Sequence, residues 1–130
     1  MSQTDPPAEE SVIKTILIVE DDVDVGEFLV QILNDQTPYQ ALLAPDGFQA
    51  LKMVKTLKPD LFLLDYLLPG MSGLELHDHL HSTDELQHIP TLFMSANMPA
   101  IEAEKRHTSY VKKPFEVEEM LEVIRQLLAQ

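Results

Sequence analysis

The chain has 130 residues and a formal net charge of −13, and 45% of its residues are hydrophobic. This length fits one domain with one hydrophobic core. The negative charge would repel duplex DNA and anionic lipid, so we expect this domain to bind neither nucleic acid nor a membrane. The absence of cysteine excludes disulfide bonds and thiol chemistry. We expect a cytoplasmic protein, because no signal peptide and no apolar run long enough to cross a bilayer is found.

Short apolar runs alternate with amphipathic segments along most of the chain. Residues 1–13 are polar and acidic, which predicts a flexible N-terminal tail, and residues 14–130 are expected to form the domain. The apolar runs predict five buried strands, at residues 15–20, 39–44, 60–65, 90–95 and 109–112. The first strand is followed by a predicted helix whose inner face carries Val25, Phe28, Leu29, Ile32 and Leu33.

Capping patterns mark the starts of two further helices. Asp46 and Gln49 can form a capping box that opens a helix reaching about residue 57. Ser72 and Glu75 can form a second one, before a helix that turns leucines inward. The final helix is predicted to bury one face, formed by Val117, Met120, Leu121, Ile124 and Leu128.

The alternation of strands and helices predicts an α/β fold, with a doubly wound parallel sheet that has helices on both faces. Ligands of such folds bind beyond the carboxyl ends of the strands. The polar residues at those ends are Glu20, Asp21, Asp22, Asp65, Ser95 and Lys113. The sequence therefore predicts that carboxylates, a hydroxyl and an ammonium group meet in one pocket.

This group of residues has the composition of a phosphoryl-transfer site. Two carboxylates about 4 Å apart repel each other by roughly 4 kcal/mol at an effective dielectric constant near 20, so the cluster needs a cation. Mg²⁺ prefers carboxylate oxygens and shares its coordination with phosphate. Lys113 and Ser95 can contact phosphoryl oxygens, and Asp65 is the candidate acceptor. A single acidic residue at a strand end is usually a solvated loop charge. Here, however, the ends of four predicted strands all carry residues that suit this chemistry.

The chain resembles a response-regulator receiver domain, the CheY-like module of two-component signalling, from about residue 15 to residue 130. The resemblance is carried by ILIVEDD (16–22), DGFQAL (46–51), PDLFLLDYLLPGMSGLEL (59–76), PTLFMSA (90–96) and YVKKPF (110–115). It implies a flavodoxin-like sheet of order 2-1-3-4-5. It also implies a phosphorylation-activated switch of a two-component or phosphorelay system, which is a regulatory domain and not a conventional enzyme.

The resemblance assigns a role to each residue of the acidic cluster. Asp65 would accept a phosphoryl group from a phosphohistidine on a sensor histidine kinase or a histidine phosphotransfer protein. The reaction would require Mg²⁺ or Mn²⁺. Asp21 and Asp65 would bind the metal directly together with the backbone carbonyl of Leu67, and Glu20 would bind it through water. Asp22 lies one place beyond the acidic pair of the family, and we expect it to be a helix cap or a solvated charge.

The resemblance also assigns the residues that would respond to the phosphoryl group. Lys113 would contact a phosphoryl oxygen, and its bond to Pro114 would be cis. Ser95 would move toward the phosphoryl group, and Tyr110 would rotate inward as the switch aromatic. An unknown downstream protein would read this change.

Two positions would tune the lifetime of the phosphorylated state. Leu67 and Asn97 lie two places after Asp65 and Ser95, where the family varies the access of water. Leucine cannot hydrogen-bond a water molecule, so we expect a fairly long-lived aspartyl phosphate.

The segment before the fifth strand departs from the family pattern. Eighteen positions separate Ser95 from Lys113, about one helical turn fewer than is usual in the family. Residues 97–109 are therefore expected to contain a shortened fourth helix. The face that reports phosphorylation in the family lies in this region.

Other readings remain open beside the receiver domain. A phosphorylation-independent, degenerate receiver would act as a protein-interaction module. A phosphatase with Asp65 as its nucleophile would need a second aspartate two places later, where this chain has Leu67. A zinc site at His77 and His81, near His79, lacks an evident third ligand, and solvated helix histidines are the more ordinary reading.

Overall fold

The sheet of the protein has the topology that the resemblance implied. A computed structural model describes residues 13–129, so the predicted tail lies outside the described residues except for Ile13. The strands form one parallel sheet in the order β2-β1-β3-β4-β5. Their bounds are Thr15–Val19 for β1, Gln40–Ala44 for β2, Leu61–Asp65 for β3, Thr91–Ser95 for β4 and Ser109–Lys112 for β5.

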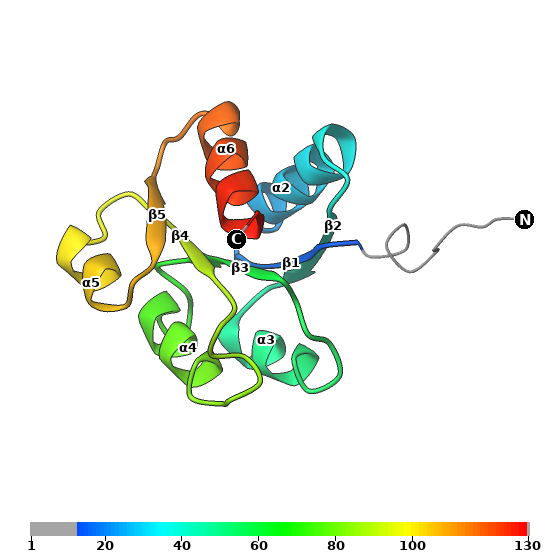
Figure 1. Ribbon diagram of the computed structural model, residues 1–130. Coiled ribbons are helices and arrows are strands. Elements are labelled where there is room, and N and C mark those ends of the chain that lie inside the picture. The colour runs from blue at the N-terminus through cyan, green and yellow to red at the C-terminus, as the bar shows by residue number, and fades with distance from the viewer. Residues whose placement is uncertain (1–12, 130) are drawn as a thin grey trace, which may run out of the picture.

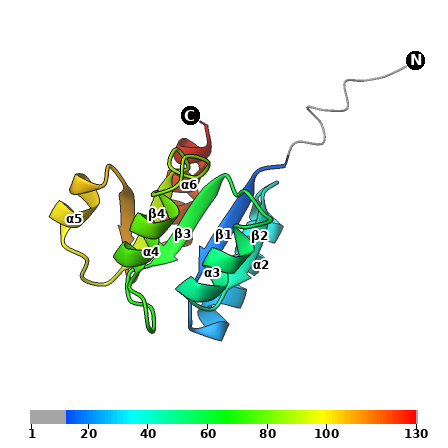
Figure 2. The same ribbon diagram turned by 90° about the horizontal axis from the view of Figure 1, so that it is seen from below.

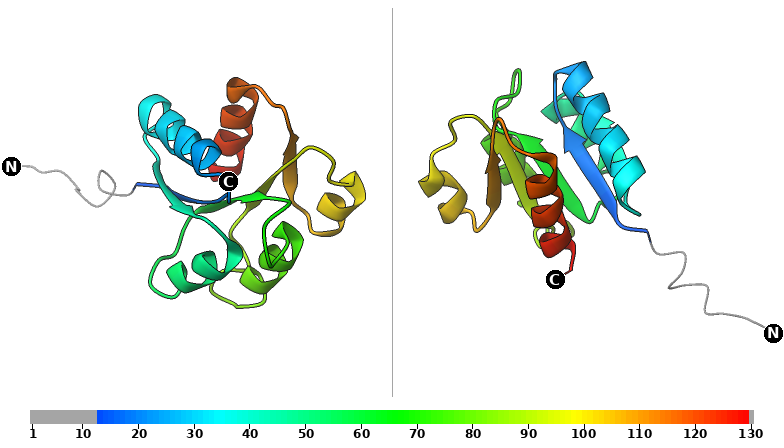
Figure 3. Two further views of the ribbon diagram at one scale, coloured as in Figure 1. Left: turned by 180° about the vertical axis from the view of Figure 1, so that it is seen from behind. Right: turned by 90° about the horizontal axis from the view of Figure 1, so that it is seen from above.

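Helices cover both faces of this sheet. They are α2 (Val23–Gln36), α3 (Gly47–Met53), α4 (Gly73–Leu80), α5 (Ala100–Lys105) and α6 (Val117–Leu128). Helices α2 and α6 cover one face, α3 and α4 cover the other, and α5 lies beside β5 (Figure 1). Figure 2 views the sheet from the side of α3 and α4, and Figure 3 adds views from behind and from the side of α2 and α6. The predicted doubly wound α/β fold is confirmed, and no helix within residues 13–129 is long and apolar enough to cross a membrane.

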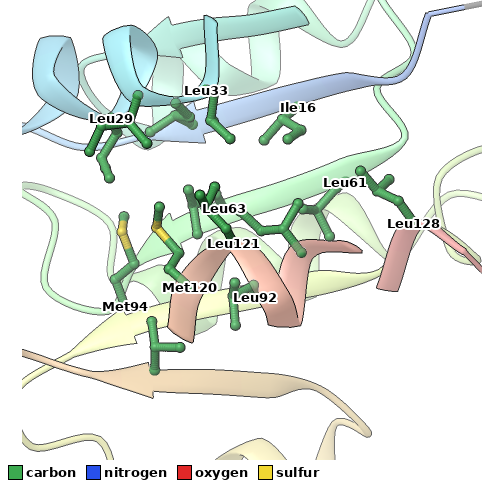
Figure 4. Packing of buried hydrophobic residues seen from close by; sticks show 14 residues of the cluster. Ile16, Leu29, Leu33, Leu61, Leu63, Leu92, Met94, Met120, Leu121 and Leu128 are labelled. Carbon is green, nitrogen blue, oxygen red and sulfur yellow. The ribbon is translucent and has the colours of Figure 1, made fainter. Parts of the chain in front are cut away.

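The buried strands divide their side chains between two hydrophobic clusters. Ile16 and Ile18 of β1 belong to the cluster under α2 and α6, and Leu17 and Val19 belong to the cluster under α3 and α4. All four side chains are fully buried. Figure 4 shows the first cluster, in which Leu121 of α6 lies beside the residues of the central strands. The strands read as continuous apolar runs because both of their faces are covered.

The face that α2 buries differs from the predicted one. Leu29 and the next two predicted apolar positions are buried, but Phe28 is 57% exposed. The buried face includes Gly26, where an added Cβ would lie 2.8 Å from a methyl group of Leu43. The helix approaches β2 closely at this glycine. Phe28 follows it by two residues, or about 200° of helical rotation, and therefore points to solvent.

The capping patterns predict the helix starts better than the helix ends. At α4 the capping box is complete: Glu75 N–H donates to Ser72 Oγ at 3.1 Å, and Ser72 N–H donates to Glu75 Oε1 at 3.0 Å. Asp46 accepts a backbone N–H from the first turn of α3 at 2.8 Å. Helix α3 ends at Met53, so its predicted extent to about residue 57 is wrong, and the chain continues there as turns.

Helix α5 is short, as the spacing between β4 and β5 predicted, and spans six residues. Its Ala103 is buried in the cluster under α3 and α4. Arg106, which follows the helix, forms a bidentate ion pair with Asp78 of α4, with two N–H···O distances of 2.9 Å. It also bonds Glu102 one turn earlier at 2.7 Å. These contacts attach the short helix to α4.

Candidate functional site

Three carboxylates meet beyond the carboxyl ends of β1 and β3. Glu20 and Asp21 follow β1, and Asp65 is the last residue of β3, the strand beside it. One oxygen of each carboxylate lies within 4.8 Å of one from each of the others. Glu20 is only 3% exposed and Asp65 only 7%, whereas Asp21 is exposed. Such a group of hard oxygen donors fits Mg²⁺ or another hard divalent cation.

Backbone N–H groups fix two of these carboxylates. Asp22 N–H donates to Glu20 Oε2 at 3.1 Å, and Leu67 N–H donates to Asp65 Oδ1 at 3.2 Å. Asp22 itself is the N-cap of α2, because its Oδ1 accepts two N–H groups from the first turn at 3.0 and 3.2 Å. The expectation that Asp22 is a helix cap is confirmed. The cap fixes the start of α2, and the N–H of the capping residue orients Glu20.

Lys113 contributes the cation of this pocket. Its Nζ lies 3.4 Å from Glu20 Oε1 and 3.6 Å from Asp65 Oδ2. Its backbone N–H donates to the carbonyl of Ser95 at 2.6 Å, which ties it to the end of β4. The bond from Lys113 to Pro114 is cis, as the resemblance implied. One ammonium group is thus placed between two carboxylates from different strands.

The charge of this cluster perturbs Glu20. The pKa of Glu20 is raised to about 7, chiefly by burial and also by the charge of the neighbouring Asp65 and a hydrogen bond with it. The N–H of Asp22 and the charge of Lys113 act in the opposite direction but do not compensate for burial. Near neutral pH Glu20 is therefore protonated in a large fraction of molecules when no metal is bound.

Replacing Glu20 by glutamine should stabilise the metal-free protein at alkaline pH. A carboxyl group whose pKa is raised in the folded state contributes stability below its ordinary value of 4.5, and this contribution is lost as pH rises through about 7. We expect Glu20→Gln to increase the free energy of unfolding by roughly 2 kcal/mol at pH 8 and much less at pH 5. Urea unfolding in EDTA at both pH values measures this difference. An equal effect of the substitution at the two pH values would contradict the raised pKa of Glu20 in the folded protein.

The hydroxyl of Ser95 lies at the end of β4 and is buried. Its Oγ accepts the N–H groups of Asn97 at 3.0 Å and Met98 at 2.7 Å, so it anchors the loop before α5. Asn97 is exposed, and Leu67 is 65% exposed. Tyr110, at 39% exposure, lies on the edge strand β5 and pairs in register with Phe93 of β4. The structure thus brings Glu20, Asp21, Asp65 and Lys113 together and places Tyr110 at the surface.

Gly73 is a residue of this site that the sequence reading missed. Its N–H donates to the carbonyl of Tyr66 at 2.9 Å. A Cβ at this position would lie 2.3 Å from the carbonyl oxygen of Asp65 and 2.9 Å from Tyr66 Cα. The first turn of α4 therefore packs directly on the backbone that carries Asp65. The sequence does carry one signal for this residue. Glycine weakens a helix, so its presence between the two residues of a capping box indicates a special constraint at that position.

His77 of α4 and His81, which caps this helix, make contacts within the protein and do not form a zinc site. His77 is only 5% exposed, and its Nδ1 lies 3.0 Å from Thr91 Oγ1, so the reading of these histidines as solvated is wrong for His77. Both ring nitrogens of His81 contact backbone carbonyls, which leaves no ligand atom for a metal. Within residues 13–129, the acidic cluster is the one group of three or more histidine, aspartate or glutamate side chains that are spaced to hold a metal ion.

Sequence comparison identifies proteins that are similar to this chain. Residues 16–125 match the family described as the response regulator receiver domain. The chain is 32% identical over 119 residues to the polar-differentiation response regulator DivK of Brucella anthropi, covering 88% of this chain and 96% of DivK. It is 36% identical over 117 residues to YrkP, an uncharacterized transcriptional regulatory protein of Bacillus subtilis, covering 86% of this chain and 48% of YrkP. The chain thus spans nearly all of one relative and about half of the other.

The fold is also that of a solved receiver domain. The receiver domain of the sensor histidine kinase PA1611 from Pseudomonas aeruginosa, determined with a magnesium ion in its active-site cleft, matches with a TM-score of 0.78 at 22% identity. The match covers 92% of this chain and 100% of that one and shows the shared fold. The family match and the similarity to DivK extend beyond the fold to the sequence. The chain belongs to the response regulator receiver domain family.

Proposed function

We propose that Asp65 accepts a phosphoryl group from a phosphohistidine and that the resulting aspartyl phosphate is the signalling state. The observation that carries this proposal is the position of Asp65 beside both the acidic pair and Lys113. In the transfer, a carboxylate oxygen of Asp65 bonds to phosphorus while the phosphorus–nitrogen bond of the donor breaks and the imidazole leaves. Positioning and charge neutralisation supply most of the catalysis of such transfers.

The residues around Asp65 would hold a metal ion that assists this transfer. A bound Mg²⁺ or Mn²⁺ would neutralise charge on the phosphoryl oxygens. Asp21 and Asp65 would hold it with the backbone carbonyl of Leu67, and Glu20 would act through water. The N–H of Leu67 already fixes Asp65 Oδ1. The PA1611 receiver domain, which shares the fold, was determined with a magnesium ion in its active-site cleft, and this supports a divalent cation at the site.

Lys113 and Ser95 would bind the phosphoryl group from the other side of the pocket. The Lys113 ammonium, 3.6 Å from Asp65 Oδ2, needs little movement to contact a phosphoryl oxygen. The hydroxyl of Ser95 accepts two backbone N–H groups, and its own proton can be donated to a phosphoryl oxygen once the side chain turns. Tyr110, now at the surface, would rotate inward when Ser95 moves.

The partners follow from this chemistry. A sensor histidine kinase or a histidine phosphotransfer protein in the cytoplasm would supply the phosphoryl group, and a downstream protein would read the change. Leu67 and Asn97 would set the lifetime of the aspartyl phosphate. The leucine side chain at 65% exposure offers water no hydrogen bond, which favours slow hydrolysis.

The proposal is tested by phosphorylation of the wild-type protein with a small donor. We expect one phosphoryl group per chain, detected by intact mass, after incubation with acetyl phosphate and Mg²⁺, and none when EDTA replaces Mg²⁺. Mn²⁺ should substitute for Mg²⁺. An unmodified chain under all conditions, with Mg²⁺ binding confirmed separately, would refute the proposal in favour of a phosphorylation-independent receiver.

A further inference from the structure

Two hollows adjoin at the amino ends of the strands, at the edge of the sheet opposite the acidic pocket. The larger has a volume of about 610 Å³, and the smaller has a volume of about 350 Å³. They share the lining residues His88, Ile89, Pro90 and Leu127, so together they form one groove, the amino-end groove. This groove is separate from the site around Asp65, which lies beyond the carboxyl ends of the strands.

A lysine or a histidine precedes each of the four adjacent strands β1, β3, β4 and β5, and all four side chains line the groove. Lys14 and Lys58 lie before β1 and β3, and His88 and His107 lie before β4 and β5. Neighbouring strands are about 4.8 Å apart, so this row crosses about 14 Å of the sheet edge. The order of the sheet thus aligns four side chains that are far apart in the sequence.

The charge of this groove is opposite to that of the whole chain. The chain has a formal net charge of −13, whereas the described residues that line the groove include Lys14, Lys58 and only one carboxylate, that of Asp60. Asp60 Oδ2 accepts the N–H of Thr15 at 2.8 Å, which turns this oxygen toward the backbone of β1. Arg106 also lines the groove, but ion pairs already engage it. Among residues 13–129 the two lysines form no ion pair and are exposed.

Apolar side chains lie beside these basic groups in the larger hollow. The lining there includes Leu127 and Leu128 at the end of α6, together with Ile89 and the prolines Pro59 and Pro90. A ligand that fills the groove would therefore need apolar groups beside its negative charges.

We propose that the amino-end groove binds an extended acidic segment of a partner protein. Carboxylates of the segment would pair with Lys14 and Lys58 and accept N–H groups from His88 and His107, because a histidine ring carries at least one N–H. An extended chain rises about 3.3 Å per residue, so about five residues cover the row. A compact anion such as phosphate would need donors that converge on one point, whereas these side chains follow the sheet edge.

The net charge of the chain makes this groove selective for where such a segment binds. An acidic segment is repelled by most of the surface of a chain with a net charge of −13, so the row of basic groups determines its position. The binding does not involve Asp65, and its test is therefore independent of phosphoryl transfer.

Defined peptides test the groove in the wild-type full chain. The probe is a fluorescein-labelled peptide of about eight residues in which glutamate alternates with leucine or proline, the prolines preventing self-association as strands. Its matched control has glutamine in place of every glutamate. Fluorescence anisotropy at low salt should show that the acidic peptide binds at least about tenfold more tightly than the control. About 0.5 M NaCl should weaken this binding, because salt screens exposed charges.

Two pairs of lysine substitutions locate the binding. Lys14→Gln combined with Lys58→Gln should weaken binding of the acidic peptide at least about tenfold. Lys52→Gln combined with Lys55→Gln removes the same charge from exposed positions outside the groove and should change the binding less than about twofold. Equal binding of the two peptides, equal losses in the two lysine variants, or no binding of the acidic peptide would overturn the proposal.

A third variant shows whether acidic residues of the chain itself take the place of a partner. Asp5→Asn, Glu9→Gln and Glu10→Gln remove three carboxylates from the sequence before Lys14, and this variant should bind the acidic peptide like the wild type. If only this variant bound the peptide, the ligand of the groove would be residues 1–12 of the same chain, and the assignment to a partner would be wrong.

Discussion

Asp65→Asn should accept no phosphoryl group from acetyl phosphate under conditions that modify the wild-type protein completely. The amide of asparagine lacks the charged oxygen that attacks phosphorus, although it can still accept the N–H of Leu67. We expect the yield of adduct to fall by at least about 100-fold. Intact mass after incubation with Mg²⁺ measures this yield. Asp84→Asn, at an exposed position outside the pocket, is the matched control and should be modified like the wild type.

The same variant also tests the electrostatics of the pocket. The charge and hydrogen bonding of Asp65 are among the causes that raise the pKa of Glu20. Their removal should bring the pKa of Glu20 down toward its ordinary value, which carboxyl ¹³C shifts follow during a pH titration. Equal phosphorylation of Asp65→Asn and the wild type would place the acceptor elsewhere. An unmoved pKa of Glu20 in a folded variant would show that the two carboxylates are not coupled.

Gly73→Ala should destabilise the protein by about 3 kcal/mol, although alanine is the better helix former. The added Cβ would lie 2.3 Å from the carbonyl oxygen of Asp65, a backbone atom that moves only if β3 or α4 moves. Urea unfolding monitored by circular dichroism measures the loss. Because the displaced backbone carries Asp65, phosphorylation of the folded variant should also slow.

Gly47→Ala is the matched control for this substitution. Gly47 also lies at the start of a helix, but its added Cβ would meet the sulfur of Met71 at 3.0 Å, and that flexible side chain can turn away. We expect a change of less than about 1 kcal/mol. If the two glycine variants were equally stable, the close approach of α4 to Asp65 would not be a constraint of the fold.

The sequence predicted the strands and the acidic pocket well because both depend on local patterns. Each strand is an apolar run covered on both faces, and the polar residue that ends it lies at the shared carboxyl edge. Asp65, Asp21 and Lys113 could therefore be placed together before their distances were known. Their chemical roles remain predictions.

Features that depend on how elements approach one another were harder to predict. Phe28 fits the apolar pattern of α2, yet the close contact at Gly26 turns it outward. His77 reads as a surface histidine, but tertiary packing buries it against Thr91. The importance of Gly73 depends on the distance between a helix and a strand end, which no spacing along the chain encodes.

The bidentate pair between Arg106 and Asp78 has a mechanical consequence. Two parallel N–H···O bonds resist twisting as well as separation, so α5 and the second half of α4 should shift as one rigid unit. The first residue of that same helix, Gly73, rests on Asp65. Helix α4 therefore connects Asp65, at its first residue, with the ion pair to Arg106 near its last turn. A shift of the backbone at Asp65 would therefore move α4 and, through the ion pair, the surface around α5.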